Sequence, residues 1–158
     1  MATLTIDLGW SFGWCTWRRG NAIASGYVNL ARLSDDDGVR LIEFSRWLTD
    51  KKAELERAGE KLTDVVYEEI NFIGDQNGVD ALHAHGKQLG NLERWCAFYK
   101  IRCRGIAWNT IKKHVTGHGS ASRQTMLEVV QKLFPEVTNA DQSSAVAVML
   151  TAKDKFAA

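Results

Sequence analysis

The sequence predicts an α/β protein whose mixed five-stranded sheet is flanked by helices. Three short apolar segments near the start are separated by tight turns, which is typical of an antiparallel meander. Helix-like and strand-like patterns then alternate, which favours parallel strands joined through helices. The chain has 158 residues, 45% hydrophobic and 25% charged. This size and composition fit one globular domain over residues 1–158.

The first apolar segment ends in an acid. Residues 4–7 form the first predicted strand, a turn containing Gly9 follows, and the second strand begins at Phe12. Residues 22–30 form the third, after a turn at 19–21. A buried carboxylate is costly unless a metal ion or a hydrogen-bond donor holds it. Asp7 is therefore either a metal ligand or a turn-capping residue, since Asp is also common before glycine.

The later elements follow from helical spacing and from capping residues. A helix that starts in the acidic residues 34–37 is expected to run to Ala58 and to end at Gly59. A strand at 64–70 carries Glu68 and Glu69, and a helix at 79–99 and a strand at 101–107 come next. Three further helices are expected at 109–115, 121–134 and 139–156, the middle one ending before Pro135.

Composition argues against a membrane protein and against a disulfide framework. The longest apolar runs are far shorter than a membrane span, and no signal-peptide pattern opens the chain, so we expect a cytoplasmic protein with no membrane partner. Cys15, Cys96 and Cys103 are odd in number and lack C-x-x-C spacing. They are predicted to be buried free thiols.

The charges are unevenly distributed along the chain. A net charge of only +1 argues against a nucleic-acid-binding protein. Residues 94–127, however, contain no Asp or Glu but several Lys and Arg residues, together with His114 and His118. A region of one sign can attract phosphates in a nearly neutral molecule. The alternative is a chance segregation of charges on a solvated surface.

Three acids are expected to meet at one edge of the sheet: Asp7, either Glu68 or Glu69, and Asp141 in the first turn of the last helix. If the two strands are adjacent and parallel, their carboxyl ends lie together. Three carboxylates without a cation would repel one another, and such oxygen ligands suit Mg²⁺ or Mn²⁺. A pair of these ions can activate water and stabilise the leaving oxygen of a phosphodiester.

Four motifs occur in an informative order. They are Ile6-Asp7-Leu8-Gly9, Tyr67-Glu68-Glu69-Ile70, the segment 111–121 that begins Ile111-Lys112-Lys113, and Ala140-Asp141 followed by Ala145-Val-Ala-Val. In order and spacing they resemble RuvC-type Holliday junction resolvases, especially short phage or prophage forms. The resemblance implies an RNase H-like fold. It also implies a homodimeric, divalent-metal endonuclease that nicks four-way or other branched DNA.

The resemblance also implies roles for individual residues. Asp7 and Asp141 match metal-binding acids, and Glu68 is preferred to Glu69 because it directly follows Tyr67. The implied catalytic residues are Asp7, Glu68, Lys112 and Asp141. Two Mg²⁺ or Mn²⁺ ions per active site would be bound by Asp7, Glu68, Asp141 and Ser144. DNA contacts are implied for Phe72, Lys112, Lys113, His114 and Arg123.

Ser144 departs from the family pattern, which has a second carboxylate three residues after the first, on the same helix face as Asp141. Serine supplies no charge. The chain is therefore a weakened or inactive endonuclease, or Ser144 is a substitution for a carboxylate in an otherwise intact site, which we favour, or another acid completes the site. An inactive form would be a catalytically silent branched-DNA-binding protein. A nucleotide-binding domain of the actin–hexokinase type shares the Asp-x-Gly opening. It is disfavoured because such proteins are larger and carry further phosphate-binding motifs.

Several other residues have less specific interpretations. His83 and His85 lie two apart on a helix, which is unsuitable for shared metal ligation, so we expect them on the surface or facing DNA. Phe72 follows the strand acids, where the family places an aromatic that can stack at a junction, with a stacking energy of roughly 1–3 kcal/mol. The amphipathic helix at 79–99 is a candidate dimer seam.

Overall fold

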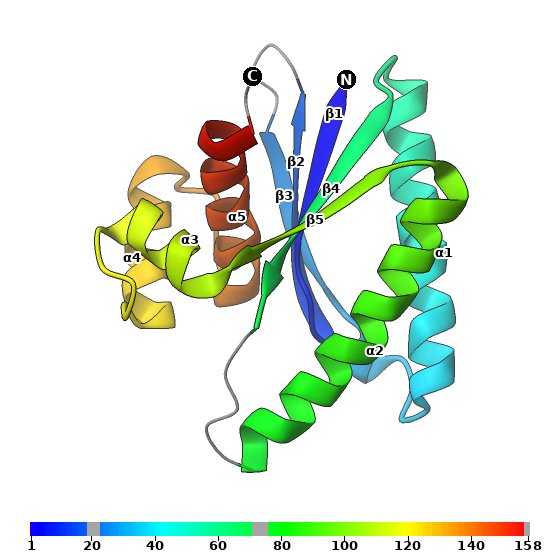
Figure 1. Ribbon diagram of the computed structural model, residues 1–158, viewed down its shortest axis with the longest axis horizontal. Coiled ribbons are helices and arrows are strands. Elements are labelled where there is room, and N and C mark those ends of the chain that lie inside the picture. The colour runs from blue at the N-terminus through cyan, green and yellow to red at the C-terminus, as the bar shows by residue number, and fades with distance from the viewer. Residues whose placement is uncertain (19–22, 71–75, 157–158) are drawn as a thin grey trace.

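The described residues form one mixed sheet with the expected topology. The computed structural model describes residues 1–18, 23–70 and 76–156, and the strands follow the order β3-β2-β1-β4-β5 (Figure 1). The strands β1 (Ala2–Asp7), β2 (Ser11–Arg18) and β3 (Ile23–Asn29) form the antiparallel meander. The strands β4 (Leu62–Glu69) and β5 (Arg102–Ala107) extend it in parallel. The predicted α/β fold class is confirmed.

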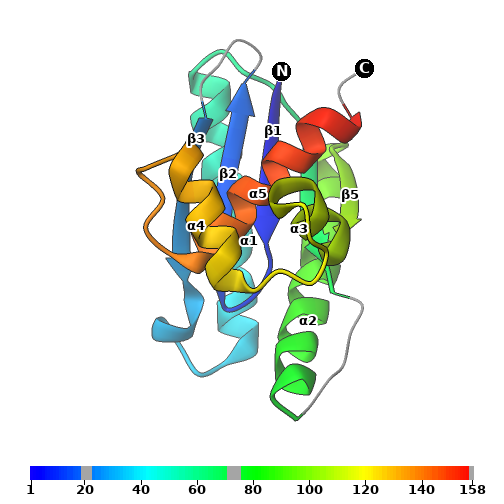
Figure 2. The same ribbon diagram turned by 90° about the vertical axis from the view of Figure 1, so that its left-hand side faces the viewer.

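The helices lie on both faces of the sheet. On one face are α1 (Asp37–Arg57) and α2 (Gln76–Tyr99), and on the other are α3 (Trp108–Thr116), α4 (Arg123–Leu133) and α5 (Ala140–Phe156) (Figure 1). Figure 2 shows α5 lying across the sheet between α3 and α4. A 3₁₀ turn, η1 (Leu30–Arg32), precedes α1 and was not expected. The helix α2 begins at Gln76, three residues before the predicted start at 79.

Two hydrophobic cores result from this layering. Between the sheet and α1–α2, residues such as Leu4, Ile6 and Phe44 are fully buried. On the other face, Val66 and Cys15 pack beneath α5. The helix α5 is buried almost all round, because the sheet lies on one side of it and α3 and α4 on the others. It is therefore a core element, and its position is tightly determined.

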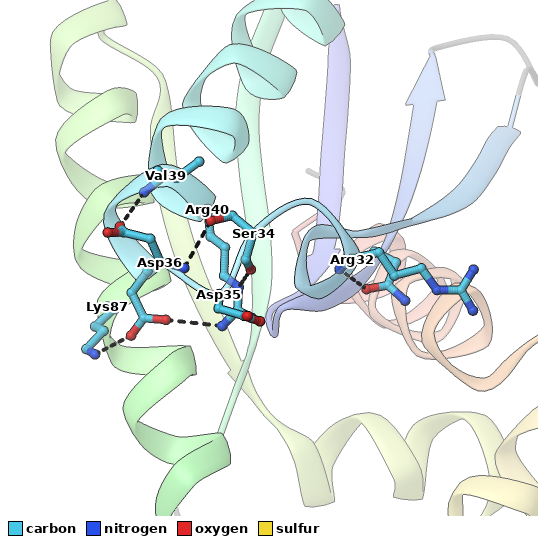
Figure 3. A network of polar contacts seen from close by, with 9 residues as sticks. Arg32, Ser34, Asp35, Asp36, Val39, Arg40 and Lys87 are labelled. Carbon is cyan, nitrogen blue, oxygen red and sulfur yellow. Dashed lines mark hydrogen bonds and ion pairs between the residues drawn. The ribbon is translucent and has the colours of Figure 1, made fainter.

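A polar network joins the start of α1 to α2. The Asp36 side chain caps α1 by accepting from the Val39 N–H at 3.0 Å (Figure 3). Asp37 accepts from Arg40 at 3.2 Å and from Lys87 of α2 at 2.6 Å. The Arg40 guanidinium also lies 5.3 Å from the centre of the Trp10 ring. The network thereby ties both helices to the turn between β1 and β2.

The three cysteines of the chain are not joined in disulfides. Cys15 and Cys96 are buried, Cys103 is half-buried, and all three are free thiols, as predicted apart from the partial exposure of Cys103. Among the described helices, none combines the length and apolar character needed to cross a membrane.

Candidate active site

A cavity of about 660 Å³ opens beside the carboxyl ends of β1 and β4. It brings together every side chain for which a catalytic or metal-binding role was expected: Asp7, Glu68, Lys112, Asp141 and Ser144. Arg123, one of the expected DNA contacts, also lines it. Residues more than a hundred positions apart in the sequence therefore share one site.

Strand alternation decides which of the two neighbouring glutamates enters the cavity. Ile6 pairs with Tyr67 in the parallel register, so Asp7 and Glu68 are the next residues of their strands. Thr5 and Val66, two positions earlier, contact α5 or its core, and alternation turns Asp7 and Glu68 to the same face. The Glu69 side chain instead lies against Gly105 of β5, where a Cβ atom would overlap it.

The third acid reaches the cavity because α5 packs closely on the meander. Gly13 of β2 makes this possible, since a Cβ there would overlap the backbone carbonyl of Asp141. The Ser11 hydroxyl donates to Asp141 Oδ2 at 2.7 Å, and the Thr5 hydroxyl donates to the Ala145 carbonyl at 2.7 Å. These contacts fix the first turn of α5 over β1 and β2.

Arg123 lies between two of the acids. It is the first residue of α4, which Ser122 caps, and its NH2 atom donates to Asp141 Oδ1 at 2.8 Å. The same NH2 atom is 3.6 Å from Asp7 Oδ2. The guanidinium therefore faces both carboxylates, although the Arg123 side chain is more than half exposed.

Acidic side chains in the cavity outnumber the basic ones. Burial raises the pKa of Asp7 well above its ordinary value, and the charge of Glu68 raises it further against the opposing effect of Arg123. Burial also raises the pKa of Glu68, although Arg123 and Lys112 act against it. Burial lowers the pKa of Lys112 in turn. Both carboxylates would gain from an additional cation.

The donor set suits a hard divalent ion, but its arrangement is not that of a closed metal site. Among the residues that the structure describes, no group of three or more His, Cys, Asp or Glu side chains is placed to hold a metal ion. Asp141 has both oxygens engaged, by Arg123 and Ser11. Asp7 and Glu68 keep raised pKa values despite Arg123. The chemistry of these two carboxylates fits Mg²⁺ or Mn²⁺.

Neighbouring elements support the site through residues that the motifs did not indicate. The Gly9 N–H donates to Gln88 Oε1 of α2 at 2.6 Å, which holds the turn after Asp7. The Lys112 ammonium lies 3.8 Å from the centre of the Trp108 ring. Asp80 of α2 also lines the cavity. The sequence indicates that Gln88 and Asp80 lie on a helix. It does not indicate their contacts, because those depend on how α2 packs.

Two of the expected DNA contacts, Lys113 and His114, do not line the cavity. Lys113 is exposed and does not line the cavity. His114 pairs with Asp154 of α5, with 2.9 Å between Nε2 and Oδ2, and lines a separate small pocket. Phe72 lies outside the described residues.

The expectation for His85 was wrong. Its side chain is only 5% exposed, and Nε2 lies 2.9 Å from the Glu68 carbonyl oxygen. The reason is that His85 lies on the same face of α2 as Gln88 and Leu92, which are buried at helical spacing. That spacing was the signal that could have indicated a buried histidine. His83 is exposed, as expected.

The fold and the position of the acids define the class of protein. An antiparallel meander extended by parallel strands, with acids on β1, β4 and the last helix, is an RNase H-like architecture. The fold is that of RuvC. The structure of RuvC from Thermus thermophilus superposes with a TM-score of 0.71 at 16% identity, over 99% of this chain and 97% of that one. The same protein in complex with a Holliday junction substrate gives 0.71 at 17% identity, over 96% and 92%.

Sequence comparison agrees over a shorter span. The crossover junction endodeoxyribonuclease RuvC of Rickettsia akari is 33% identical over 69 residues, 42% of this chain and 44% of its own. That of Rickettsia bellii is 39% identical over 56 residues, 34% and 36%. The matched span is thus less than half the length of these relatives, and no family model matches the chain. The resemblance to RuvC-type resolvases expected from the motifs is confirmed.

Proposed function

We propose that this protein is a metal-dependent, structure-selective DNA endonuclease that resolves four-way junctions or other branched DNA by paired nicks. The observation that carries the proposal is the group formed by Asp7, Glu68 and Asp141 in one cavity of a RuvC-like fold. The solved RuvC complex with a Holliday junction and the names of the sequence relatives point to the same substrate class.

Asp7 and Glu68 would hold Mg²⁺ or Mn²⁺, with Asp141 beside them. A bound divalent ion activates a water molecule and stabilises the leaving oxygen of a phosphodiester. The side chains of this chain supply the rest. Lys112 lines the cavity near Glu68, and its ammonium can neutralise charge that develops on the scissile phosphate.

DNA binding would depend mainly on phosphate contacts. Lys113 is exposed one residue beyond Lys112, and the surrounding region 94–127 has no acidic residue. Phosphate contacts of this kind bind strongly at low salt and carry no sequence information. A homodimer would present two equivalent sites to a symmetric junction, which paired nicking requires.

Ser144 favours a second candidate function, a branched-DNA-binding protein with little cleavage activity. The Ser144 side chain lines the cavity one helical turn after Asp141, where the family pattern has a carboxylate. The loss of one acid weakens metal binding but removes a negative charge close to the DNA backbone. Junction binding would therefore survive even if cleavage were slow.

Cleavage of a labelled four-way junction separates the two functions. We expect this protein to nick the junction with Mg²⁺ or Mn²⁺ and to leave a linear duplex of the same sequence intact. Asp7→Asn should abolish nicking, and Ser144→Asp should accelerate it about tenfold at limiting Mg²⁺, the usual scale for a change near a metal. Tight junction binding by a folded protein without nicking in either metal would support the silent form. Failure to bind the junction at low salt would contradict both.

A further inference from the structure

The Arg123 guanidinium lies between two of the acids in the cavity. Its NH2 atom lies 2.8 Å from Asp141 Oδ1 and 3.6 Å from Asp7 Oδ2, so one guanidinium faces both carboxylates. The second oxygen of Asp141 accepts from the Ser11 hydroxyl at 2.7 Å. Each oxygen of Asp141 thus already accepts one hydrogen bond, and the Arg123 guanidinium compensates its charge.

The surroundings limit the negative charge next to Arg123 and fix its backbone. A carboxylate at position 144 would add a second acid on the same face of α5 as Asp141, and serine adds none. The Ser122 hydroxyl oxygen accepts from the Thr125 N–H at 3.1 Å and so caps the first turn of α4. This cap fixes the backbone of Arg123. A guanidinium stays charged at all accessible pH values and presents its donors in a planar fork.

We propose that Arg123 replaces the second divalent ion, so that each active site binds a single ion on Asp7 and Glu68. The inference rests on the proposed function of the same site. It differs from the two ions that the resemblance implies, and it gives Arg123 a role distinct from simple contact with the DNA backbone.

A fixed arginine would also act on the substrate. The guanidinium has five N–H donors, and its contacts with Asp7 and Asp141 leave others for a phosphate oxygen in the cavity. Charge-assisted donors of this kind stabilise negative charge on a phosphate without any change in metal content. The side chain is 58% exposed, so substrate can reach it.

The number of bound ions tests the proposal directly, without DNA or catalysis. We would titrate the metal-free protein with Mn²⁺ by isothermal titration calorimetry and record the electron paramagnetic resonance spectrum at saturation. Two Mn²⁺ ions about 3.5–4 Å apart, as in two-metal sites, couple their spins, whereas an isolated ion keeps its six-line spectrum. We expect one Mn²⁺ per chain with an isolated-ion spectrum. Two coupled ions, or no bound Mn²⁺, would overturn the proposal.

A set of variants distinguishes the effect of Arg123 on the number of bound ions from the effect of the missing carboxylate at position 144. Ser144→Asp alone should still bind one ion, because Arg123 remains, whereas Arg123→Gln combined with Ser144→Asp should bind two coupled ions. Two ions in the single variant Ser144→Asp, or one in the folded double variant, would contradict the proposal. Lys132→Gln removes an exposed cation from the same helix and should keep one ion. If the double variant fails to fold, the wild-type and Ser144→Asp counts still decide.

The ion count and the cleavage assay fail independently. A protein that binds one Mn²⁺ but does not nick junctions keeps the inference about Arg123 and loses the proposed nuclease activity. A protein that nicks junctions with two ions keeps the activity and loses the inference.

Discussion

Asp7 is a carboxylate whose charge is disfavoured by its place in the fold. Its side chain is 16% exposed, and burial together with the charge of Glu68 raises its pKa above the ordinary value of 3.8. Between that ordinary value and the raised one, the folded protein holds a proton at Asp7 that the unfolded chain has released. The free energy of unfolding therefore falls as pH rises through this window.

Asp7→Asn removes this effect. In metal-free buffer containing a chelator, we expect the stability of the variant relative to wild type to increase as pH rises from about 4 to 8, by about 1–2 kcal/mol in total, the usual scale of a single substitution. Urea unfolding at a series of pH values measures the difference. Asp50→Asn, at an exposed position on α1, is the control and should show no such trend. A relative stability that decreased with pH would show that Arg123 outweighs burial.

The sequence predicted the acids of the site better than it predicted their partners. Strand alternation is a local property, so the preference for Glu68 over Glu69 agrees with the face on which the structure places each side chain. The contact between Arg123 and Asp141 depends on how α4 docks against α5, which no local pattern encodes. The assignment of catalytic and metal-binding roles stays a prediction.

At the scale of elements, α2 supports the site from outside it. Gln88 is buried, and its Oε1 accepts the Gly9 N–H in the turn that follows Asp7. Gln88→Leu should leave that N–H unpaired and destabilise the protein by about 1–3 kcal/mol. Cleavage should also slow, because the turn beside Asp7 loses its anchor. Lys87→Ala on the same helix removes only a partly exposed ion pair with Asp37 and should cost less than about 1 kcal/mol in urea unfolding. Equal destabilisation by the two changes would contradict this account.

The last turn of α3 carries an expected phosphate contact. Lys113 is exposed, so Lys113→Gln should remove one such contact without altering the cavity. We expect the slope of log affinity against log salt concentration to become shallower by about one unit, measured by fluorescence anisotropy on a labelled junction. Lys52→Gln, on α1 across the sheet, should leave the slope unchanged. A slope unaffected by Lys113→Gln would place the DNA elsewhere.

The ends of helices were predicted correctly where capping residues in the sequence mark them. They were missed where tertiary packing determines the boundary. Gly59 has a positive φ of 79° and follows α1, as its position in the sequence indicated. The start of α2 at Gln76 was not predicted, because the glycine and asparagine nearby favour turns in isolation. The buried position of His85 likewise reflects the packing of α2 across the end of β4.

At the scale of the whole molecule, α2 also offers a surface for the proposed homodimer. Phe98, near the end of α2, is 76% exposed. Exposed aromatics of this kind are common at protein interfaces. We expect a dimer by multi-angle light scattering and a shift toward monomer in Phe98→Ser. Tyr27→Ser, at an aromatic that is 55% exposed on the edge strand β3, is the matched control. A wild-type monomer both free and bound to DNA would contradict the dimer.

The overall topology was predictable because it follows from the order of patterns along the chain. Three consecutive strands, followed by strands separated by helices, leave few arrangements once crossovers must be right-handed and short. The close approach of α5 to β2 was not predictable, since it depends on the missing side chain of Gly13 meeting the backbone of Asp141. The arrangement of the strands could thus be derived from sequence patterns, whereas the close approach of α5 to the sheet could be seen only in the structure.

The order in which a ribosome makes the chain gives α5 a further significance. Asp7 and Glu68 lie on strands that are synthesised early, whereas Asp141 arrives only with α5, after residues 1–139. A nascent chain that has not yet released this helix has two of the three acids and an uncovered apolar face on the sheet. Such a chain lacks Asp141 and one wall of the second hydrophobic core. Translation that stops before Ala140 therefore leaves apolar surface exposed, and exposed apolar surface of this kind favours aggregation.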